Sequence, residues 1–396
     1  MATQVYPVPS RVDRLQRGAI VAALIGGLSC LAGGFANPAQ FFRSWLFAYL
    51  FWVNVGVGCI SLLLIQHLTG GMWGLVIRRL CEAGARTLYL APLFFLPVVA
   101  GMGELYPWAR PEAAADALIQ KKALYLNGTF FLLRAAFYFA VWAGLAHVLG
   151  KLSNQLDAGP NPKADRRLRG IAGGGLLLMG FTITFSSVDW AMSLDPHWFS
   201  TLYGVLFMVG QALAALTLSV VLLALFVKEA PFAGVVKPGD THDLGKLMLA
   251  FTMLWAYMHL SQFVIIWSGN LPEEIPWYIR RTHGGWQVVA QVVILFHFAL
   301  PFLLLLSRDL KRNAKRLATV AGLVFLLRLV DLFWLVAPDL ADHGGESHGL
   351  KVHGLDLAAP IALGGIWLAF FAQQLRSRPL LPVGDPEMRE RIEKAA

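Results

Sequence analysis

Charged residues are scarce in this sequence. Asp, Glu, Lys and Arg make up 14% of its 396 residues, whereas hydrophobic residues make up 57%. Soluble domains contain about 25% charged and about 45–50% apolar residues. The mean hydropathy of +0.59 points the same way. This composition excludes a soluble globular protein and a disordered one, and it indicates a chain that crosses a membrane several times.

Cysteine is also scarce, since the chain holds only Cys30, Cys59 and Cys81. Three cysteines make no disulfide framework. The chain contains no C-x-x-C-H run for covalent attachment of a c-type haem and no cysteine cluster for an iron–sulfur centre. It also lacks a P-loop and a G-x-G-x-x-G run. Redox chemistry in which this chain takes part would therefore use electrons carried by other chains or by a diffusible molecule.

Ten apolar runs are each long enough to cross about 30 Å of hydrocarbon as a helix. They predict an all-α polytopic membrane protein. The predicted spans are 18–35, 43–66, 86–103, 127–149, 168–187, 200–227, 245–268, 284–306, 315–336 and 355–375. The first run lacks a small-residue cleavage site, so we expect a retained helix rather than a signal peptide. This divides the chain into an N-terminal segment (1–17), a transmembrane domain (18–375) and a C-terminal tail (376–396).

The distribution of Lys and Arg predicts the orientation. With the N-terminus inside, 24 of the 33 Lys and Arg residues fall in inside segments and 7 in outside segments, and Arg134 and Arg328 lie within spans. Such a bias follows the positive-inside rule, so both termini are predicted to be cytoplasmic. The net charge of +9 is then explained by contact with anionic membrane lipids, and it requires no nucleic acid.

Two charged residues lie in the ninth span. Arg328 and Asp331 are three residues apart, so they share a helix face and can pair. Ionisable groups at membrane depth are costly and serve as functional candidates. The pair is either a structural staple or part of a proton pathway. Arg134 lies in the fourth span, close enough to its outer end to extend toward the surface.

Two histidines lie well inside the seventh and eighth spans, His259 and His297 respectively. Tyr257, Ser261 and Gln262 near His259 supply groups for a relay, and an imidazole can both accept and donate a proton. The sequence leaves three interpretations open: a proton or water pathway, a hydrogen bond in helix packing, and a bis-histidine haem b.

The segment 186–204 is the most unusual part of the sequence. The bond before Pro196 disfavours helix at Asp195, so we expect the fifth span to end there. Asp189, His197 and two tryptophans lie close by in the chain. We interpret them as an outward-facing proton exit or as a pocket for a quinone headgroup.

Three histidines repeat at five-residue intervals in a predicted outside loop: His343, His348 and His353. This spacing matches no short zinc pattern. We expect a solvated polar loop there, with a weak external metal site as the alternative.

Three runs resemble the F subunit of bacterial alternative complex III, a quinol:electron-acceptor oxidoreductase. They are V-D-W-A-M-S-L-D-P-H-W-F-S-T-L-Y-G (188–204), H-L-T-G-G-M-W-G (67–74) and R-T-H-G-G-W (281–286). The resemblance covers nearly the whole chain, with ten spans in the expected order. The first run is the most specific of the three.

The resemblance extends to the NrfD or polysulfide-reductase membrane-subunit superfamily. It implies two four-helix bundles, here about 43–187 and 200–336, flanked by spans one and ten. It also implies a bacterial inner-membrane complex with a C-like paralogue, an iron–sulfur protein and a c-type cytochrome as partners. In that complex the C subunit is held to bind quinol, and a proton-conducting role has been proposed for F. We transfer no quinol-binding residue to this chain.

We therefore expect a membrane subunit without a metal redox centre of its own. Its proton-pathway candidates are Arg134, Asp189, Asp195, His197, Tyr257, His259, His297, Arg328 and Asp331. Two other classes remain open, namely a structural scaffold subunit of the same complex and a stand-alone secondary transporter.

Overall fold

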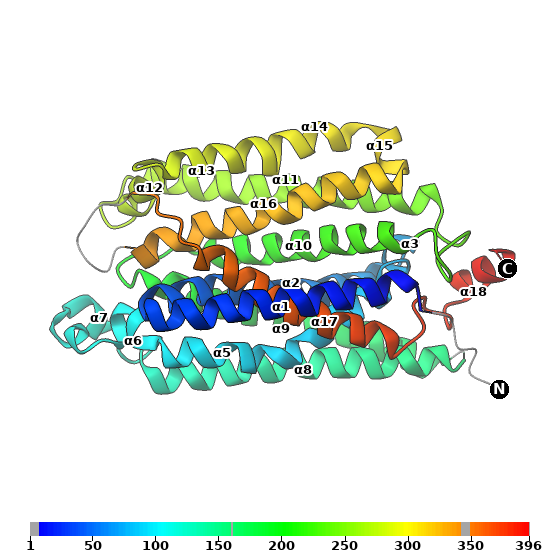
Figure 1. Cartoon of the computed structure of the whole chain (residues 1–396), viewed down its shortest axis with the longest axis horizontal. Coiled ribbons are helices and arrows are strands. Elements are labelled where there is room, and N and C mark those ends of the chain that lie inside the picture. Colours follow the sequence, from blue (N-terminus) through cyan, green and yellow to red (C-terminus); the bar gives the residue numbers. More distant parts are fainter. Residues whose placement is uncertain (1–7, 160, 342–348, 396) are drawn as a thin grey trace.

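Ten long apolar helices cross the molecule side by side (Figure 1). The structure is a computed structural model that describes residues 8–159, 161–341 and 349–395, and those residues contain helices and no strand. The predicted all-α architecture with ten spans is confirmed.

Seven of the spans are single uninterrupted helices. They are α1 (Ser10–Ala36), α2 (Pro38–Thr69), α8 (Gly128–Asp157), α10 (Tyr203–Phe226), α11 (Pro238–Gly269), α16 (Ala314–Ala341) and α17 (Leu355–Arg376). The fifth span, α9 (Pro162–Trp190), continues into a 3₁₀ turn, Met192–Leu194. Most of these helices extend past the apolar run because polar residues cap them outside it. At α11, for example, the Lys237 backbone N–H donates to Asp240 Oδ2 at 2.8 Å.

Two spans change helix type along their length. The third consists of α4 (Arg78–Arg86), a 3₁₀ turn (Thr87–Leu90) and α5 (Ala91–Ala100). The eighth consists of α13 (Trp286–Val292), a π-helical turn (Val293–Ala299) and α14 (Leu300–Leu306). The short helices are α3 (Met72–Leu75), α6 (Met102–Leu105), α7 (Ala117–Lys121), α12 (Ile275–Thr282), α15 (Arg308–Arg312) and α18 (Pro386–Ala395), with 3₁₀ turns at Pro107–Ala109 and Pro111–Ala115.

Helices α2 and α10 form the centre. They pack on each other, and 89% and 78% of their most apolar windows are buried, against 17–56% in the other spans. Around α2 lie α4, α5, α8 and α9, which we call the first bundle. Helices α11 and α16 pack on α10, and α13–α14 packs on α11 and α16; we call these four spans the second bundle. Helices α1 and α17 pair along their length and cover α2 from outside.

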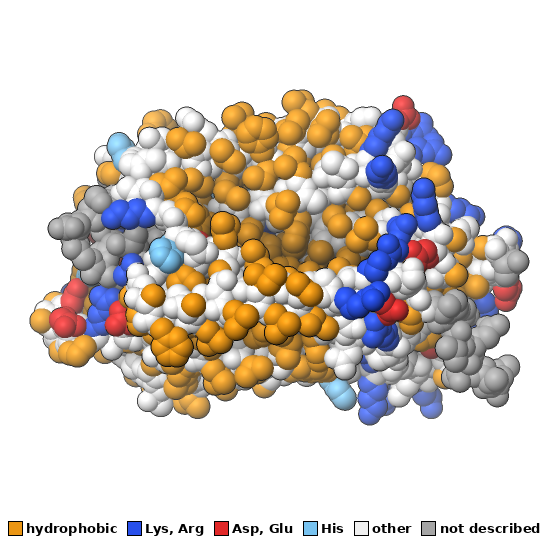
Figure 2. Space-filling view, viewed as in Figure 1, with side chains coloured by type: hydrophobic (Ala, Val, Ile, Leu, Met, Phe, Trp, Pro, Cys, Tyr) orange, Lys and Arg blue, Asp and Glu red, His pale blue; other side chains and the backbone are white. Residues whose placement is uncertain are grey.

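The two ends of the molecule differ in charge. Lys and Arg side chains gather at the end that carries α15 and α18, where α1 begins and α17 ends (Figures 1 and 2). We call this the basic end. Helices α7 and α12 lie at the opposite end. Between the two, Figure 2 shows an apolar band, as expected for a surface in contact with hydrocarbon.

Two similar glycine turns lie at opposite ends of the molecule. Gly70 and Gly71 have φ of 69° and 95° and precede α3, while Gly284 and Gly285 have φ of 62° and 97° and precede α13. Side chains rarely adopt these left-handed conformations, so both runs require glycine. The two turns lie at different ends because α3 and α13 begin at different ends (Figure 1).

Candidate functional site

A cluster of ionisable side chains lies deep in the second bundle. It consists of Arg328 and Asp331 from α16, Trp255 and His259 from α11, and His297 from the eighth span, and we call it the Asp331 cluster. Asp331, His259 and His297 each lie about ten residues from one end of their span, the end that lies away from the basic end of the molecule. At 1.5 Å per residue this is a depth of about 15 Å. The cluster is therefore at mid-depth.

The predicted pairing of Arg328 with Asp331 is confirmed. Arg328 forms an ion pair with Asp331 Oδ2, and Trp255 Nε1 donates to the same oxygen at 2.9 Å. Arg328 lies flat against Gly210 of α10, where a Cβ atom would come within 2.3 Å of its Cζ. The missing side chain at 210 thus makes room for the guanidinium inside the bundle.

The second oxygen of Asp331 differs from the first. Oδ1 accepts no hydrogen bond from the described residues, and His259 Nε2 lies 3.7 Å from it. This distance is too long for a direct hydrogen bond. The two polar atoms therefore face each other without a completed bond, in the part of the membrane where such atoms are most costly.

His297 lies on the π-helical turn and is fully buried. Its ring packs edge-on against Trp255 with centroids 4.5 Å apart, and His259 lies against the same indole at 4.4 Å. Neither ring nitrogen of His297 makes a hydrogen bond of ordinary geometry within the described chain. Pro301, one turn further, has no N–H to offer the carbonyl of residue 297, so an ordinary helical ladder is broken here.

This packing does not suit a haem held between the two histidines. A bis-histidine haem needs a flat macrocycle between the imidazoles, and Trp255 contacts both rings. The indole fills space that the macrocycle would need. The haem b alternative is therefore unsupported by the geometry.

The carboxylate of Asp189 is arranged differently, in the first bundle. Arg134 binds it with two hydrogen bonds, from Nε to Oδ2 and from Nη2 to Oδ1, each 2.9 Å. The Tyr138 hydroxyl donates to Oδ2 at 2.7 Å. Arg134 therefore turns toward α9 instead of extending to the surface, and its guanidinium also stacks on the Tyr125 ring at 3.8 Å. Both oxygens of Asp189 are satisfied.

The residues expected near Asp189 do not join it. The helix ends before Pro196 as predicted, with Asp195 in an extended conformation. Asp195 forms an ion pair with Arg280 of α12, and His197 Nε2 lies 2.7 Å from Asp116 Oδ2 on the surface. Asp189 and His197 therefore have separate partners on different elements, and an outward-facing exit or quinone pocket that includes both stays a prediction.

Tyr257 is also separate from the Asp331 cluster. Its side chain is 62% exposed on the outer face of α11. Two residues along a helix turn the side chain by about 200°, so Tyr257 points away from His259. Gln262 faces inward and accepts a hydrogen bond from the Ser200 hydroxyl at 3.1 Å. The expected relay through Tyr257 is not formed.

A further buried ion pair was not anticipated from the sequence. Arg281 of α12 is fully buried and donates to Asp339 Oδ2 at 2.5 Å and to the Leu335 carbonyl at 2.7 Å. Arg280 lies 3.6 Å from Asp339 Oδ1. The sequence feature that could have indicated this pair is the position of Asp339, eight residues or about two helical turns after Asp331.

Tyr203 is within electrostatic range of both charged groups. It is fully buried at the start of α10, and its hydroxyl makes no hydrogen bond with the described residues. The charged residues that act on it are Asp339, Arg281, Arg328 and Asp331. Ionisable and hydroxyl groups thus extend from the Asp331 cluster toward the opposite end of the molecule.

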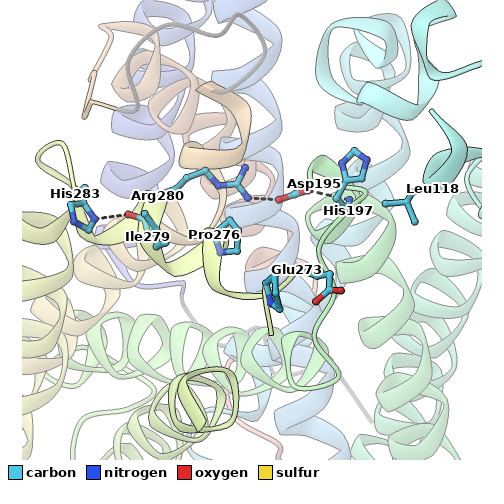
Figure 3. Close-up of a pocket in the computed structure, with 9 residues that line it drawn as sticks. Leu118, Asp195, His197, Glu273, Pro276, Ile279, Arg280 and His283 are labelled. Atoms are coloured by element: carbon cyan, nitrogen blue, oxygen red, sulfur yellow. Dashed lines mark hydrogen bonds and ion pairs between the residues drawn. The ribbon is translucent and has the colours of Figure 1, made fainter. Parts of the chain in front are cut away.

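A pocket of about 510 Å³ opens at that end, beside α12 (Figure 3). Asp195 and Arg280 form an ion pair among its lining residues, as Figure 3 shows. Its lining residues are Leu118, Asp195, His197, Pro272, Glu273, Pro276, Ile279, Arg280 and His283. Next to them, burial raises the pKa of Tyr278 to about 12, so this phenol stays protonated at neutral pH.

Another buried cluster lies at the basic end of the first bundle. Arg79 donates to Glu82 Oε2 at 2.6 Å and pairs with Asp157, and Arg378 of the tail reaches Glu82 at 3.2 Å. Arg78, Arg79 and Arg86 belong to the inside segments whose positive charge the sequence assigns to contact with lipid. These three are buried instead, and besides Glu82 of α4 their partners are Gln66, Ser377 and Asp157 from other elements.

The structure describes only one of the three histidines of the predicted outside loop. His343 and His348 lie outside the described residues, and His353 Nδ1 accepts a hydrogen bond from the Leu355 backbone N–H at 3.1 Å, before α17. Within the described ranges, no group of three His, Cys, Asp or Glu side chains is arranged to hold a metal ion.

Comparison with known proteins gives no family for this chain. No protein-family model matches it, and no curated protein matches it. The chemistry of the site therefore has to be inferred from the residues themselves.

Proposed function

We propose that this chain is a membrane subunit of a quinol:electron-acceptor oxidoreductase of the alternative complex III type, and that its second bundle provides a proton pathway. It would hold no metal redox centre of its own. Haem c and iron–sulfur clusters would belong to partner chains, namely a c-type cytochrome and an iron–sulfur protein. A C-like paralogue would lie beside it. The setting would be a bacterial inner membrane with the basic end in the cytoplasm, in keeping with the positive-inside rule.

The observation that carries the proton proposal is the open oxygen of Asp331. Its other oxygen is held by Arg328 and Trp255, which keeps the side chain in place. The open oxygen faces His259 at 3.7 Å, a separation that one water molecule can bridge. Imidazole can exchange protons in both directions, and buried carboxylates with an incomplete set of partners can take one up.

The arrangement toward the opposite end supports a route to the surface. Tyr203 is within electrostatic range of both Asp331 and Asp339, and Arg280 links Asp339 with Asp195 at the pocket. Protons would pass between Asp331 and the pocket along hydroxyl and carboxylate oxygens, while the arginines lower the cost of the negative charges.

The assignment to a quinol-oxidising complex is supported by the motifs. Two of the runs that resemble the F subunit include members of this route: Asp195 and Tyr203 lie in 188–204, and Arg281 begins 281–286. Runs that carry a resemblance and also supply the buried polar groups are expected if those groups serve the shared activity.

Isolation of a tagged copy in mild detergent tests the assignment. We expect a multihaem cytochrome c, an iron–sulfur protein and a second membrane chain of the same superfamily to co-purify, identified by mass spectrometry and by haem and iron analysis. A lone colourless protein would contradict it. Transport of a solute by the chain alone in liposomes would then favour the secondary transporter.

Asp331→Asn tests the proton pathway in the assembled complex. We expect fewer protons moved per electron, measured in proteoliposomes with a pH-sensitive dye. Asp189→Asn is the matched control. The same change in the first bundle should leave the number of protons moved per electron unaltered in those complexes that assemble.

A scaffold role is the second candidate, and the fully satisfied Arg134–Asp189 pair favours it for the first bundle. An Asp331→Asn complex with unchanged composition, turnover and proton yield would extend the scaffold role to the second bundle.

A further inference from the structure

Several cationic side chains converge where α11 meets α15 at the basic end. His242 and Lys246 project from the start of α11, and Arg308 and Lys311 come from α15, which packs on α11. His242 lies within electrostatic range of Lys246, Lys311 and Arg308. We call these four residues the basic elbow.

Lys311 fixes the geometry of the basic elbow. Its aliphatic stem covers Gly245 of α11, where an added Cβ would come within 2.6 Å of Lys311 Cγ. Only 7% of the residue is exposed. Its ammonium group has no hydrogen bond or ion pair with the described residues. A cation held this way, with its stem packed on α11 and its ammonium group without a partner in the described chain, is positioned to meet an anion from outside the chain.

The acids nearby do not neutralise the basic elbow. Asp243 accepts a hydrogen bond from Lys246 at 3.1 Å and lies 3.8 Å from His242. Asp309 is the other carboxylate of this region, and three more exposed cations follow it, namely Arg312, Lys315 and Arg316. In the described part of the chain, Arg308 and Lys311 form no ion pair. The region therefore carries an excess of positive charge.

An exposed apolar surface adjoins these cations. Leu303 and Leu306 of α14 are more than half exposed and lie directly before Arg308, and Met253 and Leu254 of α11 are exposed two turns above Lys246. Figure 2 shows the apolar band meeting Lys and Arg side chains at the upper right, where Figure 1 places α15. Cations next to an exposed apolar face match a ligand with an anionic head and hydrocarbon chains.

We propose that the basic elbow binds the phosphodiester headgroup of an anionic phospholipid, whose acyl chains lie along α14 and α11. Basic pockets between transmembrane helices at the cytoplasmic side bind such headgroups in general. Arg308 can hold two phosphate oxygens, and Lys246 and Lys311 act as point charges beside it. Inorganic phosphate presents the same oxygens without chains, so the apolar surface distinguishes the two.

Native mass spectrometry of the full-length chain in detergent tests this proposal. The probes are phosphatidylglycerol, phosphatidylcholine with the same acyl chains, and inorganic phosphate. We expect phosphatidylglycerol to bind about tenfold more tightly than phosphatidylcholine, because each cation near the surface adds to the attraction for anionic lipid. We expect inorganic phosphate at equal concentration to leave the lipid bound.

The triple variant Lys246→Gln/Arg308→Gln/Lys311→Gln should lose this preference. If it does not fold, the double variant Lys246→Gln/Arg308→Gln serves, because both of its side chains are exposed. The matched control removes three exposed cations of α9 at the same end: Lys163→Gln/Arg166→Gln/Arg167→Gln. It should keep the preference.

Three results would overturn the proposal. An equal loss in the α9 control would mean that overall surface charge attracts the lipid. Retained preference in the elbow variants would mean that the lipid binds elsewhere. Displacement of the lipid by equimolar inorganic phosphate would mean that the acyl chains contribute nothing.

Discussion

Asp189 in the first bundle and Asp331 in the second are both fully buried, and each pairs with an arginine. Their remaining contacts differ. Asp189 receives two hydrogen bonds from Arg134 and one from Tyr138, so neither oxygen is free. Asp331 concentrates its donors on Oδ2 and leaves Oδ1 facing His259.

This difference suits Asp189 to a purely structural ion pair, which we call a clamp, and Asp331 to proton exchange. A carboxylate whose two oxygens both accept hydrogen bonds, as in Asp189, would lose partners on taking up a proton. A carboxylate with an open oxygen near an imidazole can change its protonation state while Arg328 still holds the other oxygen. The predictions below test whether the two carboxylates behave as differently as their contacts.

Removal of Arg134 should give the largest loss of stability. Arg134→Gln leaves the Asp189 charge buried without compensation, which costs about 3–5 kcal/mol in comparable pairs. Thermal unfolding of the purified chain in detergent measures this loss. The double variant Arg134→Leu/Asp189→Leu should recover most of it, since no charge remains. A single variant as stable as the parent would show that the pair is not a clamp.

Crowding of Arg328 should have the next largest effect. Gly210→Ala places a Cβ within 2.3 Å of the guanidinium, and such overpacking costs about 1–3 kcal/mol. Gly180→Ala on α9 is the matched control, because no atom lies within 4 Å of its added Cβ. The control should be neutral or slightly stabilising. Equal melting temperatures for the two variants would argue against close packing of Arg328 on α10.

His259→Phe should lower stability less than the two preceding changes, and its main effect should be on proton movement. The imidazole forms no hydrogen bond to Asp331, so a ring of similar shape should cost less than about 1.5 kcal/mol. The Arg328–Asp331 pair is retained. We expect a lower proton yield per electron in the assembled complex. Tyr257→Phe, two residues away on the exposed face, should leave the yield unchanged. Equal yields for both variants would remove His259 from the pathway.

The sequence allowed prediction of those features that depend on neighbouring residues. Span number follows from apolar length, and the Arg328–Asp331 pair follows from a spacing of three residues on one helix. The end of the fifth span follows from the Asp195–Pro196 bond. Each of these depends only on residues that are close together in the chain.

Pairings across helices could not be predicted in the same way. Asp189 pairs with Arg134, which lies 55 residues earlier on another helix, and Arg281 pairs with Asp339, which lies 58 residues later. The sequence of one helix does not show which other helix will pack on it. Tyr257 was grouped with His259 because the two are close in the chain, although the helical period places them on different faces. The burial of α4 likewise depends on α2, α8 and the tail.

The surface pair of Asp116 with His197 should show the smallest effect. The pKa of Asp116 is lowered by the hydrogen bond from the Ile119 backbone N–H and by His197. A folded-state pKa below the unfolded value means that the ionised carboxylate contributes stability above the unfolded pKa of about 3.9, and that this contribution is lost as pH falls below it. Asp116→Asn should therefore lower the melting temperature slightly at pH 7, and the difference should vanish near pH 3. Because His197 is exposed and Asp116 partly exposed, solvent screens the pair, and proton yield should not change. A large fall in yield would return His197 to the pathway and weaken the contrast between Asp189 and Asp331.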